Sequence, residues 1–125
     1  MLLYEYEGYQ LFESCGIRVP QHQLITSPQQ KITPQIPIVL KAQVLSGKRA
    51  QAGGVLEIRD QRLEVSLKEL FDKQINGERV EKVHVTELID IKQEYYLSFS
   101  YDTRIRGPVL TFSPQGGSGV ESQEI

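Results

Sequence analysis

A lysine and the glycine-rich stretch behind it are the residues of this sequence with the clearest chemical potential. Lys41 lies near the end of an apolar segment, and residues 46–54 (SGKRAQAGG) follow with three glycines. Two adjacent cations, Lys48 and Arg49, lie within that stretch. A lysine ammonium binds a phosphate group as a point charge, and a glycine-rich backbone approaches neighbouring phosphates closely. The pattern therefore indicates a cradle for a polyphosphate.

A plainer interpretation of the same residues stays open. Lys41 would then lie at a sheet edge, and residues 46–54 would form a solvent-exposed hairpin loop. The stretch does not have the GxxxxGK[ST] spacing of a Walker loop, and no GxGxxG follows a strand and opens a helix. Two common nucleotide-binding folds are therefore disfavoured.

The other polar residues give less specific signals. Glu87 and Glu94 are carboxylates that could accept ribose hydroxyls or a metal, although solvated surface charge is the commoner interpretation. His22 and His84 have no nearby cysteine or second histidine at metal-ligand spacing, so we predict ordinary strand side chains. Cys15 is expected to be a buried or idle thiol, and no GxSxG motif supports nucleophilic catalysis.

Composition places the chain among soluble globular domains. Its 125 residues suffice for one domain, with 39% hydrophobic and 24% charged residues. Fourteen Lys plus Arg against sixteen Asp plus Glu leave a net charge of -2, which gives no general attraction to nucleic acid or anionic membrane. The single cysteine excludes an internal disulfide, and the acidic start is unlike a secretory signal. We expect a cytoplasmic chain with no nucleic-acid or membrane partner.

The pattern of apolar residues predicts an α+β fold. Helical spacing predicts helices over residues 4–14 and 63–74, and Asn76-Gly77 is expected to end the second one. Leu11 and Phe12 are expected on the packing face of the first helix, together with Tyr4.

Alternating or β-branched runs predict a mainly antiparallel sheet with hairpins. The final residues, QGGSGVESQEI, are expected to form a loop. Strands are predicted at residues 21–26, 38–44, 55–58, 80–87, 95–101 and 108–112.

Four segments resemble those of one enzyme family and occur in the same order. They are YEYEGYQLFESCGIRVP, VLKAQVLSGKRAQAGGV, VTELIDIKQEYYLSFSYDTRIRGPVL and GGSGVE. They are similar to the HEYQAKxLFxxYGxPVP, VKAQVxxGGRGKAGGV, EExxDIxxEYYLxxxxDRxxRxPV and EGGVxIE patterns of the succinyl-CoA synthetase β subunit. The resemblance covers nearly the whole chain and implies the N-terminal portion of an ATP-grasp module.

The resemblance implies which residues contact the phosphates. Lys41 falls on the family's phosphate-contacting lysine. Lys48, Arg49 and Ala50 fall on its Gly-Arg-Gly nucleotide-binding triplet, in which only the arginine is retained here. Replacing two glycines changes the backbone freedom of the loop, so loop closure is expected to differ.

A second group of positions matches the hinge of the nucleotide site. Thr86 occupies a position that is usually glutamate, Glu87 follows it, and Ile89 lies at a further nucleotide-contacting position. Glu94 falls on the nucleotide-contacting glutamate before YYL. Backbone groups typically hold the adenine edge in this hinge, and they tolerate side-chain replacement.

The same resemblance implies a division of residues 1–125 within a partial ATP-grasp fold. Residues 1–20 would form the N-terminal helix and its exit, and residues 21–90 a small subdomain that covers the nucleotide. Residues 91–125 would supply the first strands of the second subdomain. We expect the chain to be a fragment of a longer subunit.

The implied activity is that of an acid–CoA ligase, with ATP or GTP and Mg²⁺ as cofactors. Succinate, CoA and the nucleoside triphosphate would give succinyl-CoA, the diphosphate and phosphate. The family's magnesium ligands lie beyond the matched segments, and its phosphorylated histidine and CoA site belong to a partner α subunit. No catalytic residue is therefore assigned here, and the isolated chain is expected to be inactive.

Two alternatives accompany this interpretation. ATP-citrate lyase and related acyl-CoA synthetase subunits resemble the same module, and their downstream domains would distinguish them. A catalytically inert binding module derived from the ATP-grasp fold is the alternative from another class, and the altered Lys48–Ala50 triplet favours it.

Overall fold

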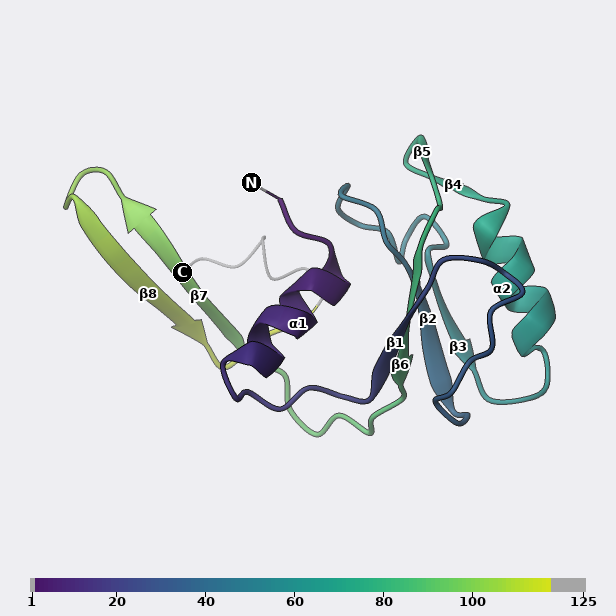
Figure 1. The fold of residues 1–125 in the computed structure, drawn as a ribbon. Helices are drawn as coiled ribbons and strands as arrows, with labels where there is room; N and C mark the ends of the chain where they lie inside the picture. Colours follow the sequence, from purple (N-terminus) through teal and green to yellow (C-terminus); the bar gives the residue numbers. More distant parts are fainter. Residues whose placement is uncertain (1, 118–125) are drawn as a thin grey trace. The chain divides into compact units, whose positions relative to one another are not determined.

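The computed structural model describes residues 2–117, and the chain divides into two compact units between Ile89 and Asp90. The described range contains two helices and eight short strands, which confirms the predicted α+β class (Figure 1). Neither described helix is long and apolar enough to cross a membrane.

A four-stranded antiparallel sheet forms the centre of the first unit. Its strands lie in the order β1 (His22–Ile25), β6 (Val83–Glu87), β2 (Ile38–Ala42) and β3 (Val55–Ile58). Lys41 of β2 therefore lies on an interior strand, opposite His84 of β6 and Val55 of β3. This position contradicts the alternative in which Lys41 lies at a sheet edge.

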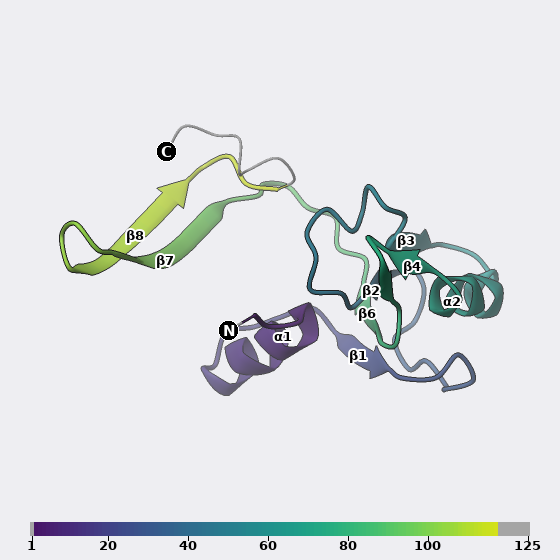
Figure 2. The ribbon, with the colours of Figure 1, turned by 90° about the horizontal axis from the view of Figure 1, so that it is seen from above.

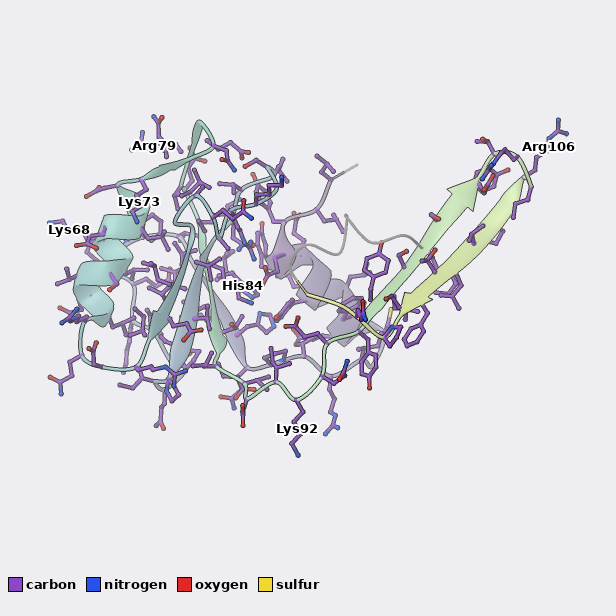
Figure 3. All side chains as sticks on the ribbon, turned by 180° about the vertical axis from the view of Figure 1, so that it is seen from behind. Lys68, Lys73, Arg79, His84, Lys92 and Arg106 are labelled. Carbon is purple, nitrogen blue, oxygen red and sulfur yellow. The ribbon has the colours of Figure 1, made fainter. Side chains whose placement is uncertain are left out.

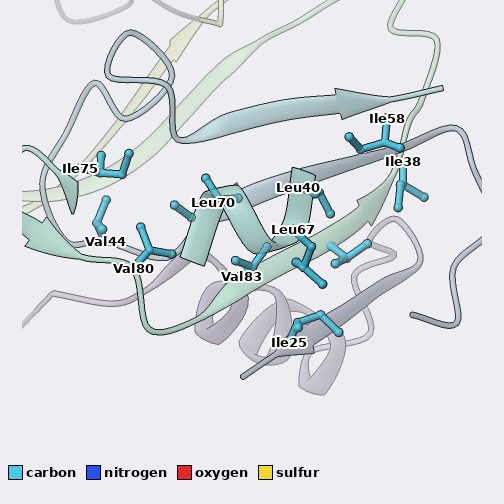
Figure 4. Close-up of a cluster of buried hydrophobic side chains, with 12 residues drawn as sticks. Ile25, Ile38, Leu40, Val44, Ile58, Leu67, Leu70, Ile75, Val80 and Val83 are labelled. Carbon is cyan, nitrogen blue, oxygen red and sulfur yellow. The ribbon is translucent and has the colours of Figure 1, made fainter. Parts of the chain in front are cut away.

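Helix α2 (Leu63–Phe71) covers one face of this sheet and forms the apolar core with it (Figure 4). Alternate residues of β2 point into this core, because successive side chains of a strand point to opposite faces. The helix ends at Phe71, three residues before the predicted end. The buried cluster comprises Ile25, Ile38, Leu40, Ala42, Val44, Ile58, Leu67, Leu70, Ile75, Val80, Val83 and Val85.

Helix α1 (Glu5–Ser14) lies on the opposite side of the sheet (Figures 1 and 2). None of its ten residues is buried, and Leu11 and Phe12 are about half exposed. The predicted apolar packing face is therefore wrong. The helix instead turns Glu5, Tyr9 and Glu13 toward the sheet, and their spacing of four residues places them on one helical face.

Asn76 and Gly77 have a different role from the predicted one. Both have positive φ angles, +51° and +82°, and they connect β4 (Gln74–Ile75) to β5 (Glu78–Arg79). Two consecutive left-handed residues form the tight turn that suits a two-residue hairpin, and Asn-Gly is the preferred pair. Strand β6 is shorter than the strand predicted at residues 80–87, since it begins at Val83.

The second unit contains the hairpin of β7 (Tyr96–Asp102) and β8 (Gly107–Ser113), and it confirms the predicted antiparallel pair. Oδ1 of Asp102 accepts a 2.7 Å hydrogen bond from the backbone N–H of Arg104, which stabilises the turn. Most of the closing segment predicted as a loop, from residue 118 onward, lies outside the described residues.

Candidate functional site

Lys41 has the anionic partner that a charge on an interior strand requires. Its Nζ atom donates a 2.9 Å hydrogen bond to Oε1 of Glu5 on α1 and lies 5.9 Å from the centre of the Tyr9 ring. The Lys41 side chain is only 21% exposed. A half-buried ammonium next to a carboxylate and an aromatic face keeps its charge compensated while it stays within reach of solvent.

Arg49 approaches the same carboxylate from the glycine-rich loop. Its Nη2 forms an ion pair with Oε2 of Glu5, while Nη1 donates a 3.2 Å hydrogen bond to the carbonyl of Ala42. Burial lowers the pKa of the Arg49 guanidinium below its ordinary value. Two cations from separate elements, Lys41 and Arg49, thus converge on one carboxylate in the first unit.

The remaining predicted residues of the loop face solvent. Lys48 and Ala50 are exposed, and Lys48 has a φ angle of +58°. This left-handed conformation favours glycine, which explains why a glycine suits the family's triplet at the position of Lys48. Gly54 closes the loop: its N–H donates to the Arg49 carbonyl at 2.7 Å, and a Cβ there would lie 3.0 Å from that oxygen.

A pair of histidines, His22 and His84, continues the polar face of the sheet. His84 lies between the sheet and α1 (Figure 3). Nε2 of His84 lies 2.9 Å from Nδ1 of His22, and Nε2 of His22 contacts Oε1 of Glu13. The Tyr9 ring packs edge-on against both imidazoles, with ring centres 4.7 Å from His84 and 5.0 Å from His22. Both histidines are strand side chains, as predicted.

His84 is the most perturbed titratable group of this face. Its side chain is fully buried, and Nδ1 makes no hydrogen bond within the described chain, although Oε1 of Glu5 lies 3.4 Å away. Burial, followed by the charges of His22, Lys41 and Arg49, lowers the pKa of His84 to about 3. His84 is therefore neutral at physiological pH.

The start of α1 is attached to the sheet through a buried amide. Oε1 of Gln43 accepts a 3.1 Å hydrogen bond from the backbone N–H of Tyr6, and Nε2 donates to the Lys41 carbonyl at 3.0 Å. The first N–H groups of a helix have no partner within the helix, so Gln43 caps α1 from a neighbouring element. Nζ of Lys82 lies 5.3 Å from the Tyr4 ring and 5.8 Å from the Tyr6 ring.

Sequence reasoning missed the role of α1 in this site. The available signal was the spacing of Glu5, Tyr9 and Glu13, four residues apart on a short helix. That spacing predicts a polar stripe, but it does not identify the cations that the stripe contacts.

The predicted hinge residues are distributed over both units. Thr86 is buried on β6, whereas Ile89 is 47% exposed at the end of the first unit. Oε1 of Glu87 accepts a 3.0 Å hydrogen bond from the N–H of Gln21, and Glu87 lines an open pocket with Gln35 and Pro37 among others.

Glu94 belongs to the second unit. Its side chain is exposed, and its carbonyl accepts a 3.0 Å hydrogen bond from the N–H of Gly116. It lines an open pocket with Ile91 and Pro114 among others.

The described residues contain neither a cluster of metal-binding side chains nor a buried cysteine. Residues 2–117 contain no group of three or more His, Cys, Asp or Glu side chains that could hold a metal ion. Cys15 is exposed rather than buried, because it follows the end of α1. What the described residues bring together is two cations, Lys41 and Arg49, around the carboxylate of Glu5.

Known proteins match this chain over almost its whole length. The β subunit of an ADP-forming succinate–CoA ligase from Methanocaldococcus jannaschii is 39% identical over 124 residues, which cover 97% of this chain and 34% of that protein. The corresponding subunit from Staphylothermus marinus is 40% identical over 126 residues, or 97% of this chain and 33% of that protein. The chain thus spans about a third of the length of the curated relatives it matches.

A solved structure shares the fold. The dinucleotide-forming acetyl-coenzyme A synthetase 1 of Ca. Korarchaeum cryptofilum, solved with coenzyme A and Ca-AMPCP, superposes with a TM-score of 0.75 at 24% identity. The match covers 95% of this chain and 56% of that one. The ATP-grasp domain family itself matches residues 2–124. These matches confirm the resemblance and the partial ATP-grasp fold expected from the sequence, and the chain belongs to the ATP-grasp domain family.

Proposed function

We propose that this chain is the nucleotide-binding part of an acid–CoA ligase β subunit. The reaction of the whole enzyme would join succinate to CoA while ATP or GTP becomes the diphosphate and phosphate. The relatives named as succinate–CoA ligase β subunits support this choice of acid and of enzyme. The cytoplasm is the proposed location.

The observation that carries the proposal is the convergence of Lys41 and Arg49. One cation comes from the middle of the sheet and the other from the glycine-rich loop, and both bind the same carboxylate. An interior strand rarely holds a lysine, because burial of an uncompensated ammonium is costly. Two such cations side by side are suited to neighbouring anionic oxygens, which a polyphosphate provides.

The role proposed for these residues is electrostatic. Lys41 would act as a point charge on one phosphate, and Arg49 would neutralise a second while its loop covers the nucleotide. Lys48 and Ala50 would contribute backbone groups to the nucleotide site. Thr86, Glu87, Ile89 and Glu94 would contact the rest of the nucleotide.

The other components of the reaction are proposed to lie outside this chain. Mg²⁺ would bridge phosphate oxygens and neutralise developing charge, with its protein ligands in a further part of the subunit. An α subunit would supply the phosphorylated histidine and the CoA site. Neither His22 nor His84 is proposed for the phosphohistidine role, since both are engaged in the polar face of the sheet.

Two observations favour the inert binding module as a second candidate. Glu5 already pairs with both cations, and the loop carries Lys48 where a glycine suits the left-handed backbone. An inert module of this kind would keep the ATP-grasp fold but would no longer bind an anion at Lys41 and Arg49.

Titration with ATP-Mg, followed by NMR of the ¹⁵N-labelled chain, tests the proposed function. We expect weak binding, with shifts centred on Lys41 and the loop. Lys41→Ala should weaken it about ten- to a hundredfold, as loss of a charged hydrogen bond worth about 1.5–3 kcal/mol predicts. Lys31→Ala is the matched control, because Lys31 is exposed in the connector between β1 and β2.

The outcomes separate the two candidates. Equal and small effects of both substitutions would remove Lys41 from the site. Absence of ATP-Mg binding by the folded wild-type chain would favour the inert module. Succinyl-CoA synthesis by the full-length subunit with its α subunit tests the choice of acid.

A further inference from the structure

Glu5 uses both of its carboxylate oxygens on the candidate anion site. Oε1 accepts the 2.9 Å hydrogen bond from Lys41, and Oε2 pairs with Arg49. Oε1 also lies 3.4 Å from Nδ1 of the buried His84. The Glu5 side chain is itself only 23% exposed, so this is a partly desolvated arrangement rather than a loose surface pair.

A bound phosphate would need the same donors. Two adjacent oxygens that bridge an ammonium and a guanidinium are common to a carboxylate and a phosphate group. Nη1 of Arg49 already donates to the Ala42 carbonyl. Nη2, which pairs with Glu5, is therefore the nitrogen that a phosphate would contact. Glu5 and a phosphate therefore compete for Lys41 and Arg49.

The attachment of α1 allows Glu5 to leave without disrupting the core. No residue of α1 is buried, and the apolar cluster is built from α2 and the strands of the first unit. Displacing the Glu5 side chain breaks ion pairs on the polar face while it leaves the α2 face intact. Elements with few buried apolar contacts are the ones that open locally at low cost in free energy.

We propose that Glu5 is an affinity-determining residue of the anion site, whose carboxylate occupies the place of a phosphate group until a polyphosphate displaces it. This inference rests on the proposed nucleotide-binding function. Because Glu5 must leave before any anion binds, it lowers the affinity of the site for every anion by the same factor, and only an anion whose several charges give it a high intrinsic affinity still binds measurably. The residue thereby weakens the site for all anions and sets a threshold of affinity that a polyphosphate is suited to exceed.

The test is titration of the whole chain with inorganic tripolyphosphate at constant ionic strength, followed by NMR. Glu5→Gln keeps the shape of the side chain and removes the competing charge, so binding should tighten about five- to tenfold, the scale of a partly screened ion pair. Glu69→Gln is the control, since Glu69 is exposed on α2 and the substitution makes the same change in net charge. Orthophosphate should gain by the same factor from Glu5→Gln, because both anions displace the same carboxylate.

A measurement on the wild-type chain does not depend on how the variant folds. The ¹³C resonance of the Glu5 carboxyl group should move as tripolyphosphate saturates the site, whereas that of Glu69 should stay in place. Unchanged or weaker binding by folded Glu5→Gln, or a Glu5 resonance that does not respond at saturation, would overturn the inference.

Two patterns of failure are distinguishable. Lys41-dependent binding of tripolyphosphate without tightening in Glu5→Gln would overturn the role of Glu5 and leave the proposed nucleotide site in place. Absence of binding by both the wild-type chain and Glu5→Gln would overturn both proposals.

Discussion

The two faces of the four-stranded sheet are built on different physical principles. The face under α2 is apolar, with Leu67 and Leu70 packed into a continuous cluster of aliphatic side chains. The face under α1 is polar and aromatic, and its contacts involve Glu5, Tyr9 and Glu13. One sheet therefore carries a helix held by the hydrophobic effect and a helix held by ion pairs and hydrogen bonds.

This difference separates the side chains that stabilise the fold from those that could exchange partners with a ligand. An apolar interface gains free energy in proportion to the area removed from water, and it has no reason to open. Half-buried ion pairs contribute little net free energy, because desolvation offsets much of the attraction, but their partners can be exchanged for those of a ligand. The α2 face is suited to holding the fold, and the α1 face is the one proposed to bind an anion.

The same substitution on the two helices tests this comparison most strongly. Leu70→Ala in α2 should lower the free energy of unfolding by about 2–5 kcal/mol, because it leaves a cavity in the core. Leu11→Ala in α1 should lower it by less than about 0.5 kcal/mol, since Leu11 is 54% exposed. Urea unfolding of both variants measures the difference. Comparable losses would mean that α1 belongs to the same core as α2.

A pH titration tests the polar face through His84. Burial holds the pKa of this histidine at about 3, against 6.5 for the free side chain. Between these values the unfolded chain binds a proton that the folded chain does not, so folding stability falls as pH decreases below 6.5. The contribution lost between pH 7 and pH 5 is about 2 kcal/mol.

The variant His84→Gln isolates this effect from those of other titrating groups. Its unfolding free energy should fall less between pH 7 and pH 5 than that of the wild-type chain. The charged or titratable groups around His84 are retained in both proteins, namely His22, Lys41, Arg49, Glu5 and Tyr9. Equal slopes in the two proteins would show that His84 is not held neutral by the fold.

Local sequence patterns were sufficient for most of the strands. The run at Val55–Ile58 and the β7–β8 pair follow from β-branched or alternating residues beside turn signals. The end of α2 was misplaced because Asn76-Gly77 has two possible uses, a helix stop and a hairpin turn. Pairing of β4 with β5 selects the hairpin, and this contact is not visible in the helical periodicity.

The site was predictable only in part, for a related reason. Lys41 within an apolar run indicated that an anionic partner was required, but the sequence offers sixteen acidic residues and no means of choosing among them. Glu5 lies 36 positions away, on a helix whose docking face depends on the cations it meets. Leu11 and Phe12 were the natural choice for that face, because apolar burial is the usual reason for a short helix to pack.

Removing the buried amide that caps α1 should have a smaller effect than the loss of Leu70 or the titration of His84, and a more local one. Gln43→Leu leaves the N–H of Tyr6 and the carbonyl of Lys41 without their partner, a loss of about 1 kcal/mol. If α1 opens independently of the core, amide hydrogen exchange should accelerate about fivefold in α1 and remain unchanged in α2. Gln51→Leu is the control, because Gln51 is exposed in the glycine-rich loop. Equal acceleration in both helices would show that the two faces unfold together and that the polar face has no independent opening through which a ligand could displace Glu5.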